Sequence, residues 1–523
     1  MKPPGGKRWE DEVQRLEEEK ELLRQMGGPE RVEKQHRLGK LTARERLDLL
    51  LDPGSFTEIG ILGRQSERYL EGKDYPTPAD GIVAGHGRID GRPVCVVSYD
   101  FLVYGGSMGE VGNRKLDRVM KMALENGYPF VCLADGSGAR IQEHMGSRAA
   151  EPLDLFVDIV AMSGYVPTAT AIMGPCFAGH ANLAGLSDFV VMVRGGGFMG
   201  ISGPPLSEMV IGEKVTAEEL GGSRIHCRQS GMADLEAESE EQALHKIREF
   251  LSYFPSNCTE VPPHRSPSDD DPDRRDAGLL HVVPESPRRS YDMRKVIRMI
   301  VDHGETMELK PDFARNVITA LARMHGRAVG IVANQPMVLA GTLDCDASFK
   351  VSRFISLCDA FGIPLIFLMD VPGFMPGQVE ERKGIIRHSA KLIYDLAVAT
   401  VPKITVVVRK AYGLGYYAMG GRGMAPDLIV AWPSAEISAM GPEGGVNVVH
   451  RRKIEASQDP EGLRRQLVEE FRKTIGPRLA AEEHFIDDII DPRETRPLII
   501  RTLEIARVKT PPRYPRKHGI TPI

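Results

Sequence analysis

The sequence predicts an α/β protein that contains two tandem copies of one domain. Short β-rich runs alternate with helical patterns, as in GIVAGHGRID, RPVCVVS, a helical segment and then PFVCLAD. A long stretch of the first half recurs in the second half, and a proline-rich, charged stretch separates the two. The 523 residues are enough for two large domains, each with its own buried core.

A constant offset in residue number defines the repeat. The stretch from Pro364 to Gly421 holds an apolar run, a Pro/Gly loop, an amphipathic helix, a second apolar run and a second glycine-bearing loop. An offset of 235 separates four matched pairs: Pro129 and Pro364, Asp135 and Asp370, Gly138 and Gly373, and Pro167 and Pro402. Residues 91 to 167 align with the second half without a gap, and further on the offset becomes 238. This regularity indicates a tandem duplication.

The predicted boundaries follow from composition. Residues 255 to 290 are rich in proline and charge and show no apolar period, which is typical of an interdomain linker. We therefore expect an N-terminal domain over 1–262, a linker over 263–290 and a C-terminal domain over 291–523.

Several helices can be placed within these domains. Capping boxes predict helix starts after Thr42 and Thr216, because Glu45 and Glu219 follow three residues later. Apolar spacing predicts further helices over residues 9–26, 113–126 and 240–250, through GIIRHSAKLIYDLA, and near 460–475 and 495–507.

The bulk composition excludes several classes of protein. A net charge of −5 provides no overall field that would recruit nucleic acid or an acidic membrane. Seven scattered cysteines without a CxxC argue for a reducing compartment and against a zinc site or disulfide framework. The N-terminus lacks a signal-peptide core, and the longest apolar runs fall short of the roughly 20 residues that span a bilayer. We therefore expect a soluble, cytoplasmic protein.

Two aligned loops in each half are the candidate functional site. The strand-ending aspartate is followed three residues later by a glycine, which gives Gly138-Ala139 in the first half and Gly373-Phe374 in the second. A second loop follows the next strand, as Phe177-Ala178-Gly179-His180 and as Gly413-Leu414-Gly415-Tyr416. Glycine lets backbone amides approach a ligand closely, and two amides from separate loops could form an oxyanion hole. Closing tight turns is the alternative role of these glycines.

The side chains suggest no nucleophile. Ser137 lacks the glycine two residues earlier that a nucleophile elbow needs. We expect His180, His226 and His388 to be hydrogen-bonded or exposed, while Glu143 and Glu443 could be either acid–base groups or ordinary surface residues. Lys121 lies in a Met-Lys-Met sequence like that of a biotinylated lysine, but within a helical segment. Six basic side chains within residues 34–46 could bind phosphates or form a solvated face. No P-loop, no GxGxxG after a strand and no metal-ligand cluster occurs.

Long stretches resemble the carboxyltransferase β subunits of biotin-dependent acyl-CoA carboxylases, of the propionyl-CoA carboxylase and methylmalonyl-CoA carboxytransferase type. The matching stretches include GKLTARERLDLLLDPGSF, ADGSGARIQE, GIVANQPMVLAGTLD, CDAFGIPLIFLMDVPGFMPG and ATVPKITVVVRKAYG, and they cover about residues 30 to 510. The resemblance implies two ClpP/crotonase-like domains, a homohexamer, and partner subunits that carry biotin carboxylase and the biotin carrier. In that family the active site lies between the N-terminal domain of one subunit and the C-terminal domain of another.

The resemblance also implies a reaction. Carboxybiotin gives up CO2 to the α-carbon of an acyl-CoA, and each of two enolates is held by one set of amides. By similarity, Gly138-Ala139 and Ala178-Gly179 should face the acyl thioester, whereas Gly373-Phe374 and Leu414-Gly415 should face biotin. Tyr417 stands where relatives vary a residue that helps select acyl length.

This sequence departs from the family in two loops. The family has two glycines and a small residue in the first loop, where this chain has a bulky Phe177 followed by Ala178, Gly179 and His180; in the second loop Leu414 replaces a glycine. We expect His180 and Leu414 to reshape the pocket. A decarboxylase or transcarboxylase subunit, a biotin-free crotonase-type hydratase or isomerase, and a catalytically silent scaffold remain as alternatives.

Overall fold

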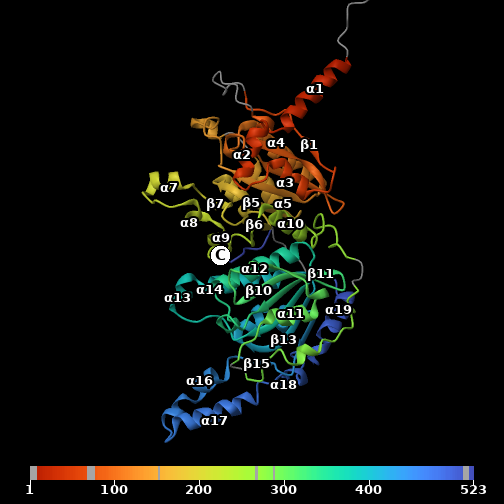
Figure 1. The fold of residues 1–523 in the computed structure, drawn as a ribbon. Coiled ribbons are helices and arrows are strands. Elements are labelled where there is room, and N and C mark those ends of the chain that lie inside the picture. Colours follow the sequence, from red (N-terminus) through yellow and green to blue (C-terminus); the bar gives the residue numbers. More distant parts are fainter. Residues whose placement is uncertain are drawn as a thin grey trace, which may run out of the picture. The chain divides into compact units, whose positions relative to one another are not determined.

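The computed structural model describes residues 9–66, 77–150, 154–265, 269–286, 289–510 and 518–522. The chain divides into two compact units, unit 1 (Met1–Glu260) and unit 2 (Val261–Ile523), which Figure 1 shows coloured along the chain. The described residues of the predicted linker make contacts within unit 2. Arg274, for example, donates hydrogen bonds to the carbonyl oxygens of Met299 and Val301. The predicted domain boundaries stay a prediction.

Unit 1 is built on an eight-stranded mixed sheet. The strand order is β1-β2-β3-β4-β5-β6-β8, and β7 pairs with β5. The pairs β1–β2 and β2–β3 are antiparallel, and all other pairs are parallel. The strands are β1 (Thr57–Ile59), β2 (Ile82–Ile89), β3 (Arg92–Tyr99), β4 (Phe130–Gly136), β5 (Thr168–Phe177), β6 (Phe189–Val193), β7 (Phe198–Gly200) and β8 (Leu235–Ala237).

Unit 2 repeats this sheet. Its order is β16-β14-β13-β12-β11-β10-β9, with β15 on β13 and with the antiparallel pairs again at the β9–β10–β11 end. The strands are β9 (Thr306–Leu309), β10 (Val317–Met324), β11 (Arg327–Asn334), β12 (Leu365–Val371), β13 (Lys403–Tyr412), β14 (Leu428–Ala431), β15 (Glu436–Ser438) and β16 (Asp488–Ile489).

The bounds of the strands confirm the predicted duplication. Each of β2, β3, β4 and β5 begins and ends 235 residues before its counterpart among β10, β11, β12 and β13. Both sheets are dominated by parallel pairs joined through helices, so the predicted α/β class is confirmed.

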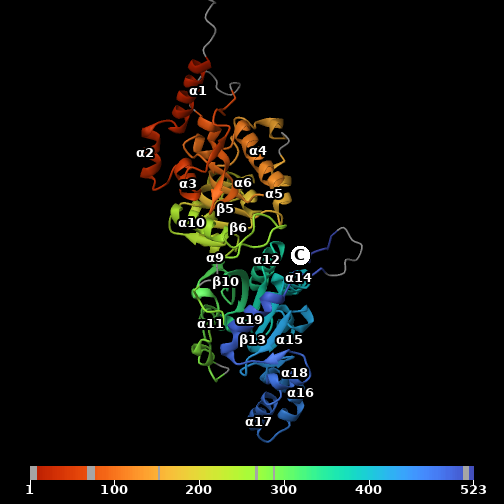
Figure 2. The same cartoon turned by 90° about the vertical axis from the view of Figure 1, so that its right-hand side faces the viewer.

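Helices cover both faces of each sheet (Figures 1 and 2). In unit 1, α4 and α5 pack on one face and α3 and α10 on the other, where the rings of Phe189 and Phe250 stack 4.6 Å apart. In unit 2, α11 and α19 share one apolar core with alternate residues of five strands, and α12 packs on β10 and β11. The unit 1 helices are α1 (Trp9–Arg24), α2 (Pro29–Arg37), α3 (Ala43–Leu50), α4 (Glu110–Asn126), α5 (Leu155–Met162), α6 (Gly179–Gly185), α7 (Pro204–Ile211), α8 (Ala217–Gly221), α9 (Ser223–Arg228) and α10 (Glu240–Leu251). Those of unit 2 are α11 (Met293–Ile300), α12 (Cys345–Ala360), α13 (Gln378–Lys383), α14 (Ile385–Val398), α15 (Gly413–Ala418), α16 (Pro442–Glu455), α17 (Pro460–Arg472), α18 (Pro477–Glu482) and α19 (Thr495–Ile505).

Most predicted helices are present. Both capping boxes form, with Thr42 and Thr216 each accepting from the backbone amide three residues on. Helices α16 and α18 are among those that no sequence pattern indicated. Helix α16 carries a weakly segregated apolar face and two adjacent glycines, so its apolar spacing is poor.

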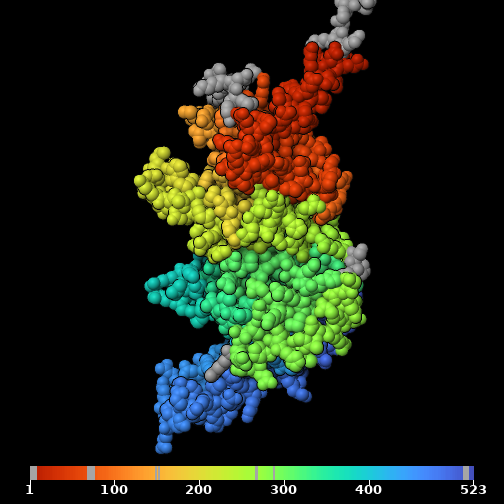
Figure 3. Space-filling view, viewed as in Figure 1, coloured from red at the N-terminus to blue at the C-terminus, as the bar shows by residue number. Residues whose placement is uncertain are grey.

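Two helices that follow the second loops stand out from their units. Figure 3 shows α7 as a yellow lobe on the surface of unit 1. Met209, Val210 and Ile211 on this helix are each more than two-thirds exposed, as are Val448 and Val449 on α16. At the downstream offset of 238, Val210 and Ile211 are the counterparts of Val448 and Val449. The duplicated domain therefore presents equivalent apolar surfaces in both copies.

In each unit a buried lysine binds main-chain carbonyl groups at the start of β2 or β10. The Lys115 ammonium donates to the carbonyl oxygens of Ala79 (3.0 Å) and Ile82, and burial lowers its pKa to about 8. Its counterpart Lys350 donates to the carbonyl oxygens of Lys310, Phe313 and Val317 at 2.8 to 3.0 Å, and burial lowers its pKa to about 7. Each ammonium therefore replaces the water that these carbonyl groups would otherwise bind.

Substituting Lys350→Met should destabilise unit 2 by about 3 kcal/mol, because it leaves several buried carbonyl groups without a donor. Urea unfolding followed by circular dichroism would measure this change. Lys391→Met is the matched control, since that side chain is one-third exposed and pairs with Asp395 one helical turn away. Equal destabilisation by both variants would contradict the role assigned to Lys350.

Candidate active site

The first loop of unit 1 presents an outward-facing amide. The Met108 amide donates to the Gly138 carbonyl oxygen at 2.9 Å, and the Arg140 amide donates to the Met108 carbonyl oxygen at 2.9 Å. In such a one-residue parallel bridge the amide of the intervening residue points away from the partner strand. Ala139 is exposed, and its N–H therefore points away from Met108 toward the surface.

The first loop of unit 2 has the same geometry. The Leu343 amide donates to the Gly373 carbonyl oxygen at 3.0 Å, and the Met375 amide donates to the Leu343 carbonyl oxygen at 2.7 Å. The Phe374 amide is therefore turned outward in the same way. Gly138 (φ 95°) and Gly373 (φ 133°) occupy backbone conformations that favour glycine, which explains why this residue type stands before each outward amide.

The second loop of unit 1 lies against the first. A Cβ atom built on Gly138 would lie 3.6 Å from the Phe177 carbonyl oxygen. Ala178 takes a left-handed φ of 56°, and its amide already donates to the Gly200 carbonyl oxygen at 3.0 Å. Gly179, the first residue of α6, is therefore the next amide available to a ligand in this loop.

The second loop of unit 2 is even closer to its partner. A Cβ atom built on Gly415 would lie 3.1 Å from the Gly373 Cα and 2.9 Å from the Val371 Cγ2. The left-handed φ of 55° falls on Gly413, so Leu414 follows the strained position rather than occupying it. The Leu414 side chain is half exposed. The absence of a side chain at Gly415 is what allows the two loops to meet.

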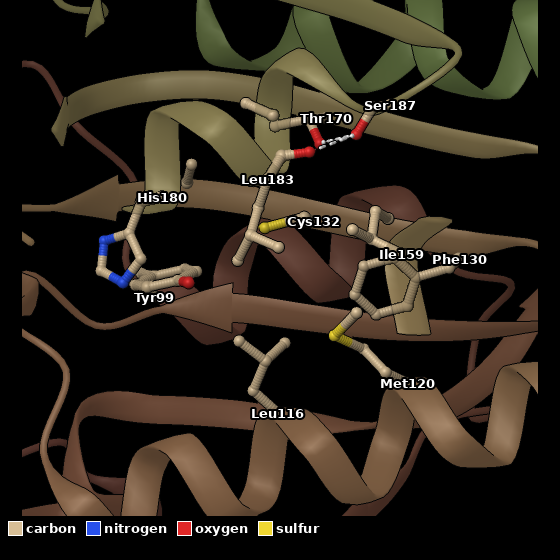
Figure 4. Close-up of a pocket in the computed structure, with 12 residues that line it drawn as sticks. Tyr99, Leu116, Met120, Phe130, Cys132, Ile159, Thr170, His180, Leu183 and Ser187 are labelled. Atoms are coloured by element: carbon tan, nitrogen blue, oxygen red, sulfur yellow. Dashed lines mark hydrogen bonds between the residues drawn. The ribbon is translucent and has the colours of Figure 1, made fainter. Parts of the chain in front are cut away.

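His180 does not enter the predicted pocket, contrary to expectation. Its ring is buried beneath the loop, edge-on to the Tyr99 ring at a centroid distance of 5.0 Å. Figure 4 shows the two rings at one end of an apolar cavity, Phe130 and Met120 at the other end, and the Thr170–Ser187 hydrogen bond along one side. Burial lowers the pKa of His180 to about 4, so the ring is neutral at pH 7. Nδ1 has no hydrogen-bond partner among the described residues, but the ring also bonds to the Gly136 backbone, which partly opposes the lowering of its pKa by burial, so the expectation that this histidine is hydrogen-bonded is met in part. His226, by contrast, is bonded through both nitrogens, to the Met199 carbonyl oxygen and to Ser230.

An open, mainly apolar groove of about 660 Å³ adjoins Gly179. The Phe156 ring, which projects from α5, comes within 3.6 Å of the position that a Gly179 Cβ would take. Five apolar side chains that line the groove are Phe156, Leu186, Met199, Ile201 and Met232. The amide of Gly179 therefore lies at the edge of a surface that suits an apolar ligand.

Buried ion pairs support β4 of unit 1 just before the first loop. Asp135, fully buried, accepts from Lys40 Nζ at 2.6 Å and from Arg46 Nη2 at 2.8 Å, and Arg46 also forms a bidentate pair with Glu240. Desolvation lowers the pKa of Lys40, although Asp135 opposes this effect. Asp100, which burial brings to a pKa of about 7, also belongs to this charged region.

Asp370, the counterpart of Asp135, is held by different side chains. It accepts from Tyr291 Oη at 2.9 Å, from Arg409 Nε at 3.0 Å and from the Lys410 amide at 3.1 Å. Position 174, the counterpart of Arg409, is a glycine, and a Cβ there would lie 1.7 Å from Asp135 Oδ1. The two units therefore pair the same buried carboxylate with cations from different elements.

The other candidate residues from the sequence lie in ion pairs. Glu143 is buried and bonded to Arg140 Nη1 at 2.7 Å, and Glu443 forms a surface ion pair with Arg472 at 2.9 Å. Lys121 lies within α4 and pairs with Asp117 and Asp154, as expected of a helical residue rather than a biotinylated hairpin lysine. Lys40 and Arg46 of the basic stretch face buried carboxylates rather than a phosphate site.

The described residues contain no cluster of three or more His, Cys, Asp or Glu side chains that could hold a metal ion. Within the same described ranges, every helix is too short or too polar to cross a bilayer.

Comparison with known proteins identifies the family. A family model described as the carboxyl transferase domain matches residues 34–521. The chain is 44% identical over 515 residues to the propionyl-CoA carboxylase carboxyltransferase subunit of Haloferax mediterranei, and the alignment covers 98% of this chain and 99% of that one. It is 45% identical over 515 residues to the methylmalonyl-CoA carboxyltransferase 12S subunit of Propionibacterium freudenreichii subsp. shermanii, covering 98% and 97%. A crystal structure of transcarboxylase 12S, a hexamer with methylmalonyl-coenzyme A and methylmalonic acid bound, superimposes with a TM-score of 0.94 at 43% identity and full coverage of both chains.

The duplicated sheets and their paired loops thus define a carboxyltransferase built from two units of ClpP/crotonase-like fold. The chain belongs to the carboxyl transferase family. The family resemblance, the crotonase-like fold and the transferase class expected from the sequence are confirmed.

The sequence reasoning missed the side chains that support the loops. Arg46 and Lys40 lie more than 85 residues before their partner Asp135, so no local spacing connects them. The only available signal was that an aspartate ends a continuous apolar run, since a buried carboxylate requires a cation or several donors.

Asp100 predicts a pH dependence of the stability of unit 1. Its pKa is about 7 in the folded chain against an ordinary value of 3.8, so between these pH values the unfolded chain releases the proton while the folded chain retains it. Stability therefore falls as pH rises through this window, by about 1.4 kcal/mol per pH unit at most. Asp100→Asn should reduce this fall in the urea midpoint between pH 4.5 and 7.5. An undiminished fall in the variant would contradict the assignment.

Proposed function

We propose that this chain is the carboxyltransferase component of a biotin-dependent acyl-CoA carboxylase, acting on a short-chain, propionyl-like acyl-CoA. The observation that carries the proposal is the duplicated pair of loops. Each unit turns one amide outward through a main-chain bridge, at Ala139 and at Phe374, and places a second loop against it. Two such sites suit a reaction in which two carbonyl oxygens gain negative charge.

The loops of unit 1 would bind the acyl thioester. Ala139 and Gly179 would donate to the thioester oxygen as the α-carbon loses its proton, while Gly138 and Ala178 supply the left-handed turns that orient these donors. The groove beside Gly179 supports this assignment, because its lining is mainly apolar and therefore suits a short aliphatic acyl group. Removing one donor from an oxyanion hole costs about 100- to 1000-fold in rate in other enzymes.

The loops of unit 2 would bind biotin. Carboxybiotin on a separate carrier protein would supply the carboxyl group. Phe374 and Gly415 would donate to its ureido oxygen, while Gly373 shapes the first loop and Leu414 flanks the second. The fit is supported by the outward Phe374 amide and by the close approach of Gly415 to Gly373, which brings the two loops together.

The substrate class and the partners follow from the relatives. The relatives described above are a propionyl-CoA carboxylase subunit and a methylmalonyl-CoA carboxyltransferase subunit, which supports a short acyl chain. Tyr417, 44% exposed on α15, is the proposed residue for selecting acyl length. We further propose a homohexamer, with a biotin carboxylase and biotin carrier as partner subunits and a cytoplasmic location. The equivalent exposed apolar surfaces of α7 and α16 support assembly.

Transfer of isotope from carboxybiotin to a panel of acyl-CoAs would test the proposal. Labelling of propionyl-CoA in preference to longer chains is the expected result. Turnover without biotin would favour a hydratase or isomerase instead, and failure to label any acyl-CoA with any carrier would favour a scaffold. Release of CO2 from methylmalonyl-CoA without an acceptor would favour the decarboxylase alternative, which shares the same two sites.

A single methyl group should impair the biotin site. Gly415→Ala places a Cβ 2.9 Å from Val371 and 3.1 Å from the Gly373 Cα, which forces the two loops of unit 2 apart. We expect carboxyl transfer to fall by about 10- to 100-fold, since small displacements of reacting groups are costly, while the affinity for acyl-CoA is retained. Gly476→Ala is the control, because nothing lies within 4 Å of its added methyl group. Wild-type transfer by Gly415→Ala would argue against biotin binding at these loops.

A further inference from the structure

A buried cluster of charges lies directly behind the first loop of unit 1. Arg140, the residue after Ala139, is 2% exposed. Its Nη1 donates to Asp80 Oδ1 at 2.6 Å and to Glu143 Oε1 at 2.7 Å, and its Nη2 donates to the Ser107 carbonyl oxygen at 3.0 Å. The free oxygens of the two carboxylates accept from the backbone amides of Gly112 and Glu110, both at 2.8 Å, at the start of α4.

This cluster reaches the chain segment to which the loop is bridged. The backbone of Arg140 bonds to Met108, and its guanidinium bonds to the preceding carbonyl of Ser107. The Tyr104 ring lies 4.9 Å from the guanidinium carbon, and Gln65 Nε2 donates to Glu143 at 2.6 Å. Main chain and side chain of one residue therefore attach the loop to the same segment.

Gly109 leaves the space that the cluster occupies. A Cβ atom built on Gly109 would lie 2.3 Å from Arg140 Nη1, 2.7 Å from Glu143 Oε2 and 2.8 Å from Asp80 Oδ2. The charged side chains thus fill the volume that any larger residue at position 109 would need.

Unit 2 lacks this cluster at the equivalent positions. Arg140, Asp80 and Glu143 correspond to Met375, Arg315 and Gln378 at the offset of 235. The Thr342 carbonyl, the counterpart of the Ser107 carbonyl, accepts from Asn316 Nδ2 at 2.7 Å, so its donor comes from outside the loop. Asp344, the counterpart of Gly109, caps α12 by accepting from the Ala347 amide at 2.8 Å.

The loop of unit 1 also has more glycine than its counterpart. Gly105 and Gly136 correspond to Ala340 and Val371. Because glycine has more allowed backbone conformations than alanine or valine, this segment of unit 1 can adopt more alternative conformations than its counterpart. A loop with this freedom needs an additional constraint if one of its amides is to keep a single direction.

We propose that Arg140 is a positioning residue of the first hole, whose guanidinium holds the Ala139 amide in its donating orientation by linking the loop to Asp80, Glu143 and the Ser107 carbonyl. The inference rests on the proposed function for its effect on turnover. It assigns no contact between Arg140 and the substrate, so the expected defect lies in the chemical step rather than in binding.

The test compares Arg140→Lys with Arg496→Lys in the intact protein. Arg496 is an equally buried arginine of unit 2 that bonds to Asp302 and to the Ile300 carbonyl oxygen, both at 2.8 Å, away from the loops. A lysine keeps the charge but loses the fork that reaches several acceptors at once. We expect Arg140→Lys to lower kcat for carboxyl transfer by about 10- to 100-fold with KM for acyl-CoA within about threefold. Arg496→Lys should leave kcat per folded molecule unchanged.

A second variant tests the same contact without changing a charge. Gly109→Ala should displace the guanidinium and lower kcat in the same way, whereas Gly196→Ala, whose added methyl group meets only ordinary contacts at 3.7 Å, should not. Equal losses in both arginine variants, or unchanged kcat in Arg140→Lys and Gly109→Ala, would overturn the proposal.

Hydrogen exchange separates this inference from the proposed function. Exchange of backbone amides in the segment 136–145 should be faster in Arg140→Lys than in the wild type or Arg496→Lys. Unchanged exchange would overturn the positioning role. If the wild type transfers no carboxyl group to any acyl-CoA, the proposed function fails, while the exchange measurement still decides whether Arg140 holds the loop.

Discussion

The outward amides of Ala139 and Phe374 depend on a bridge of two main-chain hydrogen bonds to a neighbouring segment. In both units the carbonyl group of the same peptide and the amide of the next residue are already bonded to the neighbouring segment, at distances of 2.7 to 3.0 Å. The outward amide has no main-chain partner among the described residues and cannot rotate inward without breaking the bridge. Preorganisation of this kind is what an oxyanion site requires, because the donor must not reorient as charge develops.

The sheet places these bridges where two loops can meet. The first loop follows β4 or β12, the second follows β5 or β13, and these strands are parallel neighbours. Parallel neighbours end at the same edge, so loops more than 35 residues apart in sequence come into contact. Gly138 and Gly415 carry no side chain that would hold the two loops apart.

The two copies have diverged chiefly in how buried charges support the loops. Asp135 is paired with cations from the N-terminal segment, whereas Asp370 is paired with Arg409 of the adjacent strand. Only unit 1 adds the cluster around Arg140. Because a buried carboxylate without partners is costly, each copy had to retain some cation, but the fold did not dictate which element supplied it. Divergence in support with retention of the amide geometry agrees with two sites that bind different molecules.

Much of the fold was predictable, because repetition and apolar periodicity are carried by the sequence itself. The offset of 235 matched the two halves, the β-rich runs agree with strands such as β2, β3, β4 and β12, and the capping boxes at Thr42 and Thr216 located helix starts. Helices α16 and α18 were not predicted, because α16 has little apolar segregation and α18 is only six residues long. The candidate loops were found by their glycines. The location of His180 was not, since nothing local decides whether a side chain beside a loop faces the core or the surface.

The sequence by itself determined the duplicated α/β architecture, the glycine-bearing loops and the family. Tertiary structure alone decided which amides are available and what holds them. The Ala178 amide donates to the Gly200 carbonyl oxygen, while the Gly138 carbonyl oxygen accepts from the Met108 amide and the Arg140 amide donates to the Met108 carbonyl oxygen. The partners of these groups lie more than 20 residues away along the chain, and a hydrogen bond between distant segments forms only when the folded sheet brings them together.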